Sequence, residues 1–117
     1  MAGNVYGPAN LQDEIERFQP DTASASGRRS EILVKNDDLR VLLVTMRAGA
    51  ELAEHSAPGT ITIHALSGDL TVEADGDSYD LSAGGIVSLA AGVRHAVRAR
   101  TDGAFLLTIA WSGRSAG

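Results

Sequence analysis

Three histidines, His55, His64 and His95, are the side chains best suited to chemistry in this sequence of 117 residues. An imidazole can bind a divalent metal, transfer a proton or hydrogen-bond a ligand. The chain has no cysteine, which excludes disulfides, thiolate metal sites and cysteine nucleophiles. It also lacks the patterns of a serine nucleophile elbow, a phosphate-binding loop and a dinucleotide-binding loop. A functional site is therefore expected at the histidines.

His95 and His55 are both candidates for a site inside a β-rich fold. In the stretch HAVRAR, strand alternation places His95 on one face with Val97 and Ala99, so it is expected to point toward the core. A core histidine with hydrogen-bonded ring nitrogens would show the same pattern. His55 ends the strand-like AELAE and opens the loop SAPG, where it could face the mouth of a barrel or lie on the surface.

The role of His64 depends on which way its strand faces. In TITIHALS it alternates with Ile61 and Ile63, so it points away from the interior if the isoleucines point inward. Ile61 and Ile63 are then expected to form the apolar wall of a ligand pocket. A β-bulge would reverse the side of His64 and let it join a site with the other two histidines.

One short helix is expected before the strands, over residues 10–19. Asn10 is a suitable N-cap, and the apolar residues recur at helical spacing, namely Leu11, Ile15 and Phe18. We expect this helix to cover the edge of a sheet. Residues 1–29 are predicted to comprise the helix and a flexible arm, residues 30–112 a single β-domain, and residues 113–117 a tail.

The β-domain is predicted from turn signals that recur at roughly eight to eleven residues, a spacing typical of an antiparallel sandwich or barrel. Alternation in LTVEA and SYDLS points four side chains inward: Leu70, Val72, Tyr79 and Leu81. The last strand, AFLLTIAW, is apolar on both faces. Such a strand must be covered on both sides, by the helix in part and by a second subunit for the rest. The chain is therefore expected to form a homodimer.

Composition narrows the range of partners and locations. The net charge is −5, which disfavours nucleic-acid binding. No apolar run approaches the ~20 residues of a membrane span. The N-terminus does not have the pattern of a signal peptide. With no cysteine present, a cytoplasmic location is expected.

The spacing of glycines and histidines resembles the two motifs of the cupin superfamily over roughly residues 30–112. The first motif has Gly, His, His, Glu and Gly at spacings that fall here on Gly49, His55, Ala57, Ile61 and Gly68. The second has Gly, Pro, Gly, His and Asn at spacings that fall on Gly84, Ala90, Gly92, His95 and Ala99. The glycines and one histidine of each motif match, whereas the second metal histidine, the metal glutamate, the proline and the asparagine do not.

The resemblance implies an all-β fold, a jelly-roll or double-stranded β-helix barrel, with His55 and His95 converging at one end. The form His55-Ser56-Ala57-Pro58-Gly59 is similar to small cupins without an assigned activity. Because neither Ala57 nor Ile61 can bind a metal, the first hypothesis is a metal-poor cupin that binds a small, partly apolar metabolite through His55 and His95.

Two enzymatic alternatives stay open at this point. One is a metal-dependent oxygenase or isomerase of a small organic acid, holding Zn, Fe, Mn or Ni with His55, His95 and His64. The other is a metal-free epimerase in which a histidine base works with Tyr79 as its acid. The sequence does not decide whether the chain is an enzyme, and a sensing role would also suit the first hypothesis.

Overall fold

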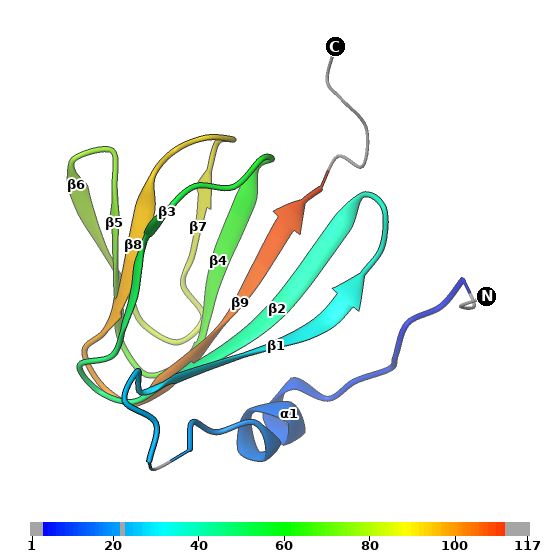
Figure 1. Ribbon diagram of the computed structural model, residues 1–117, viewed down its shortest axis with the longest axis horizontal. Coiled ribbons are helices and arrows are strands. Elements are labelled where there is room, and N and C mark those ends of the chain that lie inside the picture. Colours follow the sequence, from blue (N-terminus) through cyan, green and yellow to red (C-terminus); the bar gives the residue numbers. More distant parts are fainter. Residues whose placement is uncertain (1–3, 22, 112–117) are drawn as a thin grey trace.

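The computed structural model describes residues 4–21 and 23–111, which form one short helix followed by nine strands in two antiparallel sheets that face each other (Figure 1). The five-stranded sheet has the order β1-β2-β9-β4-β7 and the four-stranded sheet the order β3-β8-β5-β6. The elements are α1 (Leu11–Arg17), β1 (Arg28–Lys35), β2 (Leu39–Met46), β3 (Glu51–His55), β4 (Ile61–Ser67), β5 (Leu70–Ala74), β6 (Asp77–Leu81), β7 (Ile86–Leu89), β8 (His95–Ala99) and β9 (Gly103–Ala110). The predicted all-β jelly-roll fold with one N-terminal helix is confirmed.

The core lies between the sheets and follows the alternation of the strands. On β8, His95, Val97 and Ala99 are buried while Arg98 between them is exposed. The inward positions of Leu70, Val72 and Leu81 are confirmed as well. Tyr79 differs from these three, because its side chain is 41% exposed and is not part of the core. It faces the same way as Val72, its partner in register, but β6 is an edge strand with no neighbour on its far side.

The helix α1 forms as predicted, but its buried residue packs on the outer face of the five-stranded sheet, over β2 and β9, and not on an edge strand. The side chain of Asn10 accepts a hydrogen bond from the backbone N–H of Asp13, which caps the first turn. Ile15 is buried against Leu43 and Ala104, which come from β2 and β9. Among the described residues, α1 therefore covers the outer side of the two-sided strands near Leu43 and Ala104. The predicted tail, 113–117, lies outside the described residues.

The turn between β4 and β5 shows why one motif glycine is needed. Gly68 has φ of 73°, in the left-handed region that side chains with a Cβ rarely adopt. Its Cα also lies against the backbone of Asp102 and Gly103, where an added Cβ would overlap the Asp102 carbonyl. This close approach ties the β4–β5 turn to the start of β9.

Candidate functional site

His55 and His95 meet at one end of the four-stranded sheet. They are partners in register between β3 and β8, just past a register shift in β3. Their ring centroids are 4.2 Å apart, and the rings are tilted by 57°. His55 is half-buried, and His95 is only 2% exposed. The structure therefore brings together the two histidines that the sequence singled out.

Backbone carbonyls fix the orientation of both rings. Nδ1 of His55 lies 2.9 Å from the carbonyl oxygen of Ala53, and Nδ1 of His95 lies 3.1 Å from that of Val93. A carbonyl only accepts hydrogen bonds, so each Nδ1 must carry the proton and donate it. In the neutral ring the lone pair then resides on Nε2. Neither Nε2 has a hydrogen-bond partner among residues 4–21 and 23–111.

The environment of His95 favours its neutral form. Burial lowers the pKa of His95 below its ordinary value of 6.5, because a charged ring would lose its hydration. The hydrogen bond to the Val93 carbonyl acts in the opposite direction, and the nearby His55 lowers this pKa further. His95 therefore offers an unprotonated Nε2 at neutral pH.

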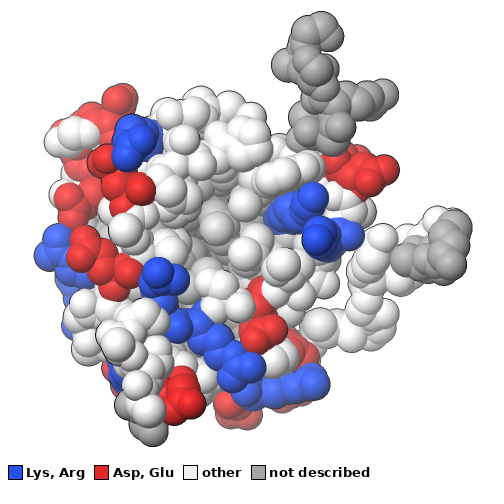
Figure 2. All heavy atoms as spheres, viewed as in Figure 1, with Lys and Arg blue, Asp and Glu red and all other residues white. Residues whose placement is uncertain are grey.

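A cavity of about 220 Å³ opens beside the histidine pair. Its walls are mainly apolar, and Figure 2 shows a hollowed, uncharged area on this side of the molecule with charged side chains around it. Residues from the loop after β3 and from β4, β8 and β9 line the cavity: His55, Ser56, Ala57, Pro58, Ile61, His95, Leu107, Ile109 and Trp111. The site is thus a small apolar pocket with two imidazoles at one side.

Ile61 and Ile63 have different places in the structure, although both were expected in the pocket wall. Ile61 lines the cavity as predicted. Ile63 points to the same face but is fully buried in the core, and it does not line the cavity. Sequence reasoning missed Leu107, Ile109 and Trp111. The signal that pointed to them was the two-sided last strand, whose inward face supplies Leu107 and Ile109, with Trp111 directly after its end.

The loop after β3 is held in place by contacts with the loop before β8 and with the end of β9. The backbone N–H of Gly92 donates to the carbonyl of Ala57 at 2.9 Å, and that of Ala110 donates to Thr60 at 2.9 Å. Gly59 lies so close to Ala110 that an added Cβ would overlap its carbonyl oxygen. A glycine is therefore required at this point for the loop to close one side of the cavity.

His64 lies on the opposite face of β4 from Ile61 and Ile63. It is in register with Leu106 of β9 and Ile86 of β7, on the outer side of the five-stranded sheet. No bulge turns it inward, since β4 and β7 pair without a shift from Ile61 to His64. This corrects the alternative in which His64 joins the pair as a third ligand.

The donor set at the pocket does not fit a resident metal. Within the described residues, no group of three or more histidine, aspartate or glutamate side chains could hold a metal ion. Catalytic zinc sites, for comparison, use three protein ligands. The side chains of Ala57 and Ile61, at the positions where the cupin pattern has ligands, are apolar parts of the cavity wall. Glu54, next to His55, pairs with Arg94 at 2.8 Å on the surface instead of orienting the histidine.

Comparisons with known proteins agree with this fold. Residues 42–111 match the model of the cupin domain family, so the chain belongs to the cupin family. No curated protein of established function matches it. A conserved protein of unknown function from Streptococcus pyogenes shares 27% identity at a TM-score of 0.70, over 75% of this chain and 77% of the other.

Two further solved structures show the same fold at lower identity. A cupin superfamily protein from Desulfitobacterium hafniense has a TM-score of 0.72 at 18% identity, over 79% of this chain and 84% of the other. Salicylate 1,2-dioxygenase from Pseudoaminobacter salicylatoxidans, solved as adducts with gentisate, has a TM-score of 0.68 at 22% identity. That match covers 86% of this chain but only 29% of the larger enzyme.

Proposed function

We propose that this cupin domain binds a small, partly apolar metabolite in the cavity beside His55 and His95. The observation that carries the proposal is the pair of Nε2 atoms whose rings are locked by carbonyls on the Nδ1 side. An apolar cavity with a few oriented polar groups is the usual form of a small-molecule site. The similar structures, among them a protein of unknown function and a dioxygenase, support the fold without indicating a ligand.

The chemistry available to the pair follows from its tautomers. A ligand hydroxyl or N–H can donate to the Nε2 of either ring. The same atom can take up a proton, so His95 or His55 could serve as a general base for a bound ligand. The metal-free epimerase alternative requires Tyr79 as its acid, but Tyr79 is exposed and does not line the cavity. This observation disfavours that alternative.

The chain contains two kinds of reporter for a binding test, namely tryptophan fluorescence and histidine ring NMR signals. Trp111 is its single tryptophan and lines the cavity, whereas His64 lies on the far face of β4 and does not. We expect neutral fragments such as benzyl alcohol and benzamide to change Trp111 fluorescence and to shift the ring NMR signals of His55 and His95. His64 signals should not move. If fragments shift His64 as much as the pair, or leave all three unchanged, the proposal fails.

The metal-dependent alternative, an oxygenase or isomerase of a small organic acid, has one observation in its favour. Metal-bound histidines commonly donate their other ring N–H to a carbonyl, as His55 and His95 do here. It still lacks a third ligand among the described residues. Activity that depends on added Zn, Fe, Mn or Ni, and that His55→Ala abolishes, would favour this alternative over the metal-poor pocket.

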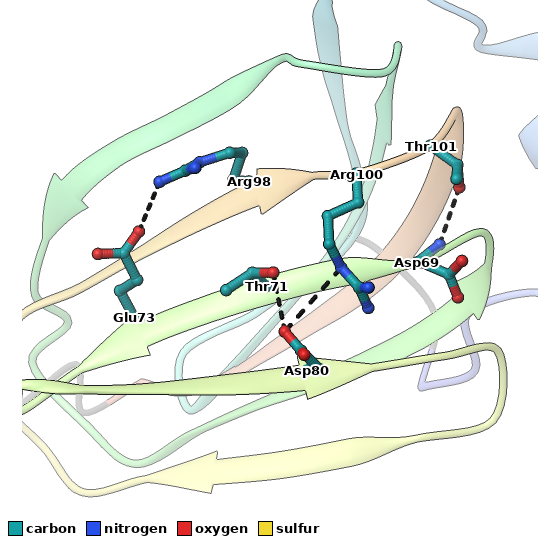
Figure 3. A network of polar contacts seen from close by, with 7 residues as sticks. All are labelled: Asp69, Thr71, Glu73, Asp80, Arg98, Arg100 and Thr101. Carbon is teal, nitrogen blue, oxygen red and sulfur yellow. Dashed lines mark hydrogen bonds and ion pairs between the residues drawn. The ribbon is translucent and has the colours of Figure 1, made fainter.

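We also propose that the chain forms a homodimer through the outer face of its five-stranded sheet. The outer face of the four-stranded sheet is charged, with ion pairs between Arg98 and Glu73 and between Arg100 and Asp80 (Figure 3). The other sheet instead exposes an apolar edge, where Ile86 is 60% exposed.

No helix among the described residues is long and apolar enough to cross a membrane. The cytoplasmic location stays a prediction.

Light scattering after gel filtration tests the dimer. Ile86→Asp places a charge on the proposed interface, and Ile32→Asp places one on another exposed isoleucine, which is 57% exposed on the inward side of β1. We expect a dimer for the wild type and for Ile32→Asp, and a monomer for Ile86→Asp. A monomeric wild type would contradict the dimer.

A further inference from the structure

Arg40, at the start of β2, is a half-buried cation. Its side chain forms no ion pair with the described residues, although Asp37 and Asp38 lie in the turn just before it. Its Nε is buried and has no hydrogen-bond partner within residues 4–21 and 23–111. A buried donor without an acceptor is uncommon, because it has lost its water and gained nothing in return. The guanidinium is therefore suited to an oxygen atom from outside the chain.

The register of the five-stranded sheet places Arg40 beside the cavity. Arg40 is opposite Ile109 of β9, and Ile109 is opposite Ile61 of β4. Residues directly opposite in antiparallel strands project from the same face of the sheet. Ile109 and Ile61 both line the cavity, so Arg40 extends their row toward β1. Lys35, opposite Arg40 on β1, adds a second positive charge to this row.

The guanidinium of Arg40 contacts Trp111, a residue of the cavity wall. The central carbon of the guanidinium lies 4.3 Å from the centroid of the Trp111 ring, and Trp111 itself lines the cavity. The backbone N–H of Trp111 donates to the carbonyl of Asp38 at 2.9 Å, which anchors the end of β9. Within residues 4–21 and 23–111 the side chain of Arg40 donates no hydrogen bond and forms no ion pair. Its guanidinium can therefore hold a carboxylate through two parallel hydrogen bonds.

We propose that the metabolite bound in this cavity is a small carboxylic acid, whose carboxylate pairs with Arg40 at the rim. Its apolar body lies against Ile61 and Ile109, and its other end approaches His55 and His95. This inference rests on the proposed function, since it names the ligand class of the same cavity. Two strand spacings separate Arg40 from Ile61, about 10 Å in all. The body of the acid is therefore about the size of one aromatic ring or a short alkyl chain.

Matched acids and amides test the charge directly. The probes are benzoate and hexanoate, each compared with its primary amide, and Trp111 fluorescence with the histidine NMR signals reports their binding. The variants are Arg40→Met, which keeps much of the apolar stem, and Arg40→Lys, which keeps the charge but loses the planar fork. Arg98→Met is the control, because it removes the same charge from the outer face of β8.

We expect each acid to bind wild-type protein at least tenfold more tightly than its amide, which corresponds to about 1.4 kcal/mol. Arg40→Met should abolish this preference, Arg40→Lys should reduce it, and Arg98→Met should leave it unchanged. Equal binding of acid and amide, or a preference for the acid that survives in Arg40→Met, would overturn the carboxylate site. In that case, binding of the neutral fragments would still support the proposed pocket. Failure of every probe to reach Trp111 and the two histidines would overturn both proposals.

Discussion

Introducing a histidine at Ala57 and a glutamate at Ile61 should turn the cavity into a metal site. Both residues line the cavity with His55 and His95, and both stand where the cupin pattern has ligands. The double variant Ala57→His/Ile61→Glu would offer four donors in place of two. Three or four protein ligands are what structural and catalytic divalent sites use. If the pocket has the cupin geometry without the cupin ligands, the two substitutions supply what is missing.

The loss of stability caused by the Ile61→Glu substitution follows from the burial of Ile61, whose side chain is 2% exposed. Losing this burial costs about 1.5–3 kcal/mol. A buried carboxylate without a partner raises the cost of the Ile61→Glu change to about 3–5 kcal/mol. A bound metal at a hundred times its Kd raises the free energy of unfolding of the double variant by about 2.7 kcal/mol. For a domain of 117 residues this corresponds to a rise in Tm of about 10 °C on metal addition.

Thermal unfolding of untagged protein, followed with and without Zn or Mn and again after a chelator, measures this shift. The matched control is Ala57→His/Ile61→Gln, which keeps the size of the new side chain but removes its charge, and which should respond less. Wild type should not respond. A folded double variant whose Tm does not change with metal would refute the inference that Ala57 and Ile61 are what make the pocket metal-poor. An equal shift in wild type would refute it too.

Three further predictions follow from burial and contact. The pKa of His95 is lowered in the fold, so its neutral form stabilises the domain above pH about 6.5, and this stability is lost as the pH falls through the lowered pKa. The urea midpoint should therefore fall more between pH 7.5 and 5.5 in wild type than in His95→Gln. Equal decreases in the two proteins would contradict this. Gly59→Ala, which forces a Cβ against the Ala110 carbonyl, should destabilise the fold by about 1–3 kcal/mol and change the tryptophan fluorescence; an unchanged Tm and spectrum would contradict the close approach. Ile63→Ala should cost about 2–5 kcal/mol in chemical unfolding because the side chain is fully buried, whereas Ile32→Ala, at an exposed isoleucine, should cost about 0.5 kcal/mol or less; equal losses would contradict the assignment of Ile63 to the core.

The parts of the site that could be predicted from the sequence are those encoded locally. The inward direction of His95 follows from alternation within one strand, as does the outward direction of His64. The pairing of His55 with His95 was expected from the resemblance to the cupin motifs, and the structure places the two rings 4.2 Å apart. A side chain's face within a strand is set by a period of two residues, so a short stretch of sequence is enough to assign it.

The parts that could not be predicted depend on which strands become neighbours. Arg40 lies next to the cavity-lining Ile109 only because β2 pairs with β9, which in turn pairs with β4. Trp111 joins the wall because the end of β9 is anchored to Asp38, far away in the sequence. Tyr79 points inward by alternation yet remains exposed, because β6 is at the edge of its sheet. Alternation gives the direction of a side chain but not what lies in front of it.

The metal content of untagged protein, measured by elemental analysis of wild type and His55→Ala, tests the central claim most directly. The claim is that two histidines and an apolar wall form a metal-poor pocket for an organic ligand. It predicts that both proteins carry metal far below one ion per chain and that the substitution changes nothing. Near-stoichiometric metal in wild type that His55→Ala removes would contradict it.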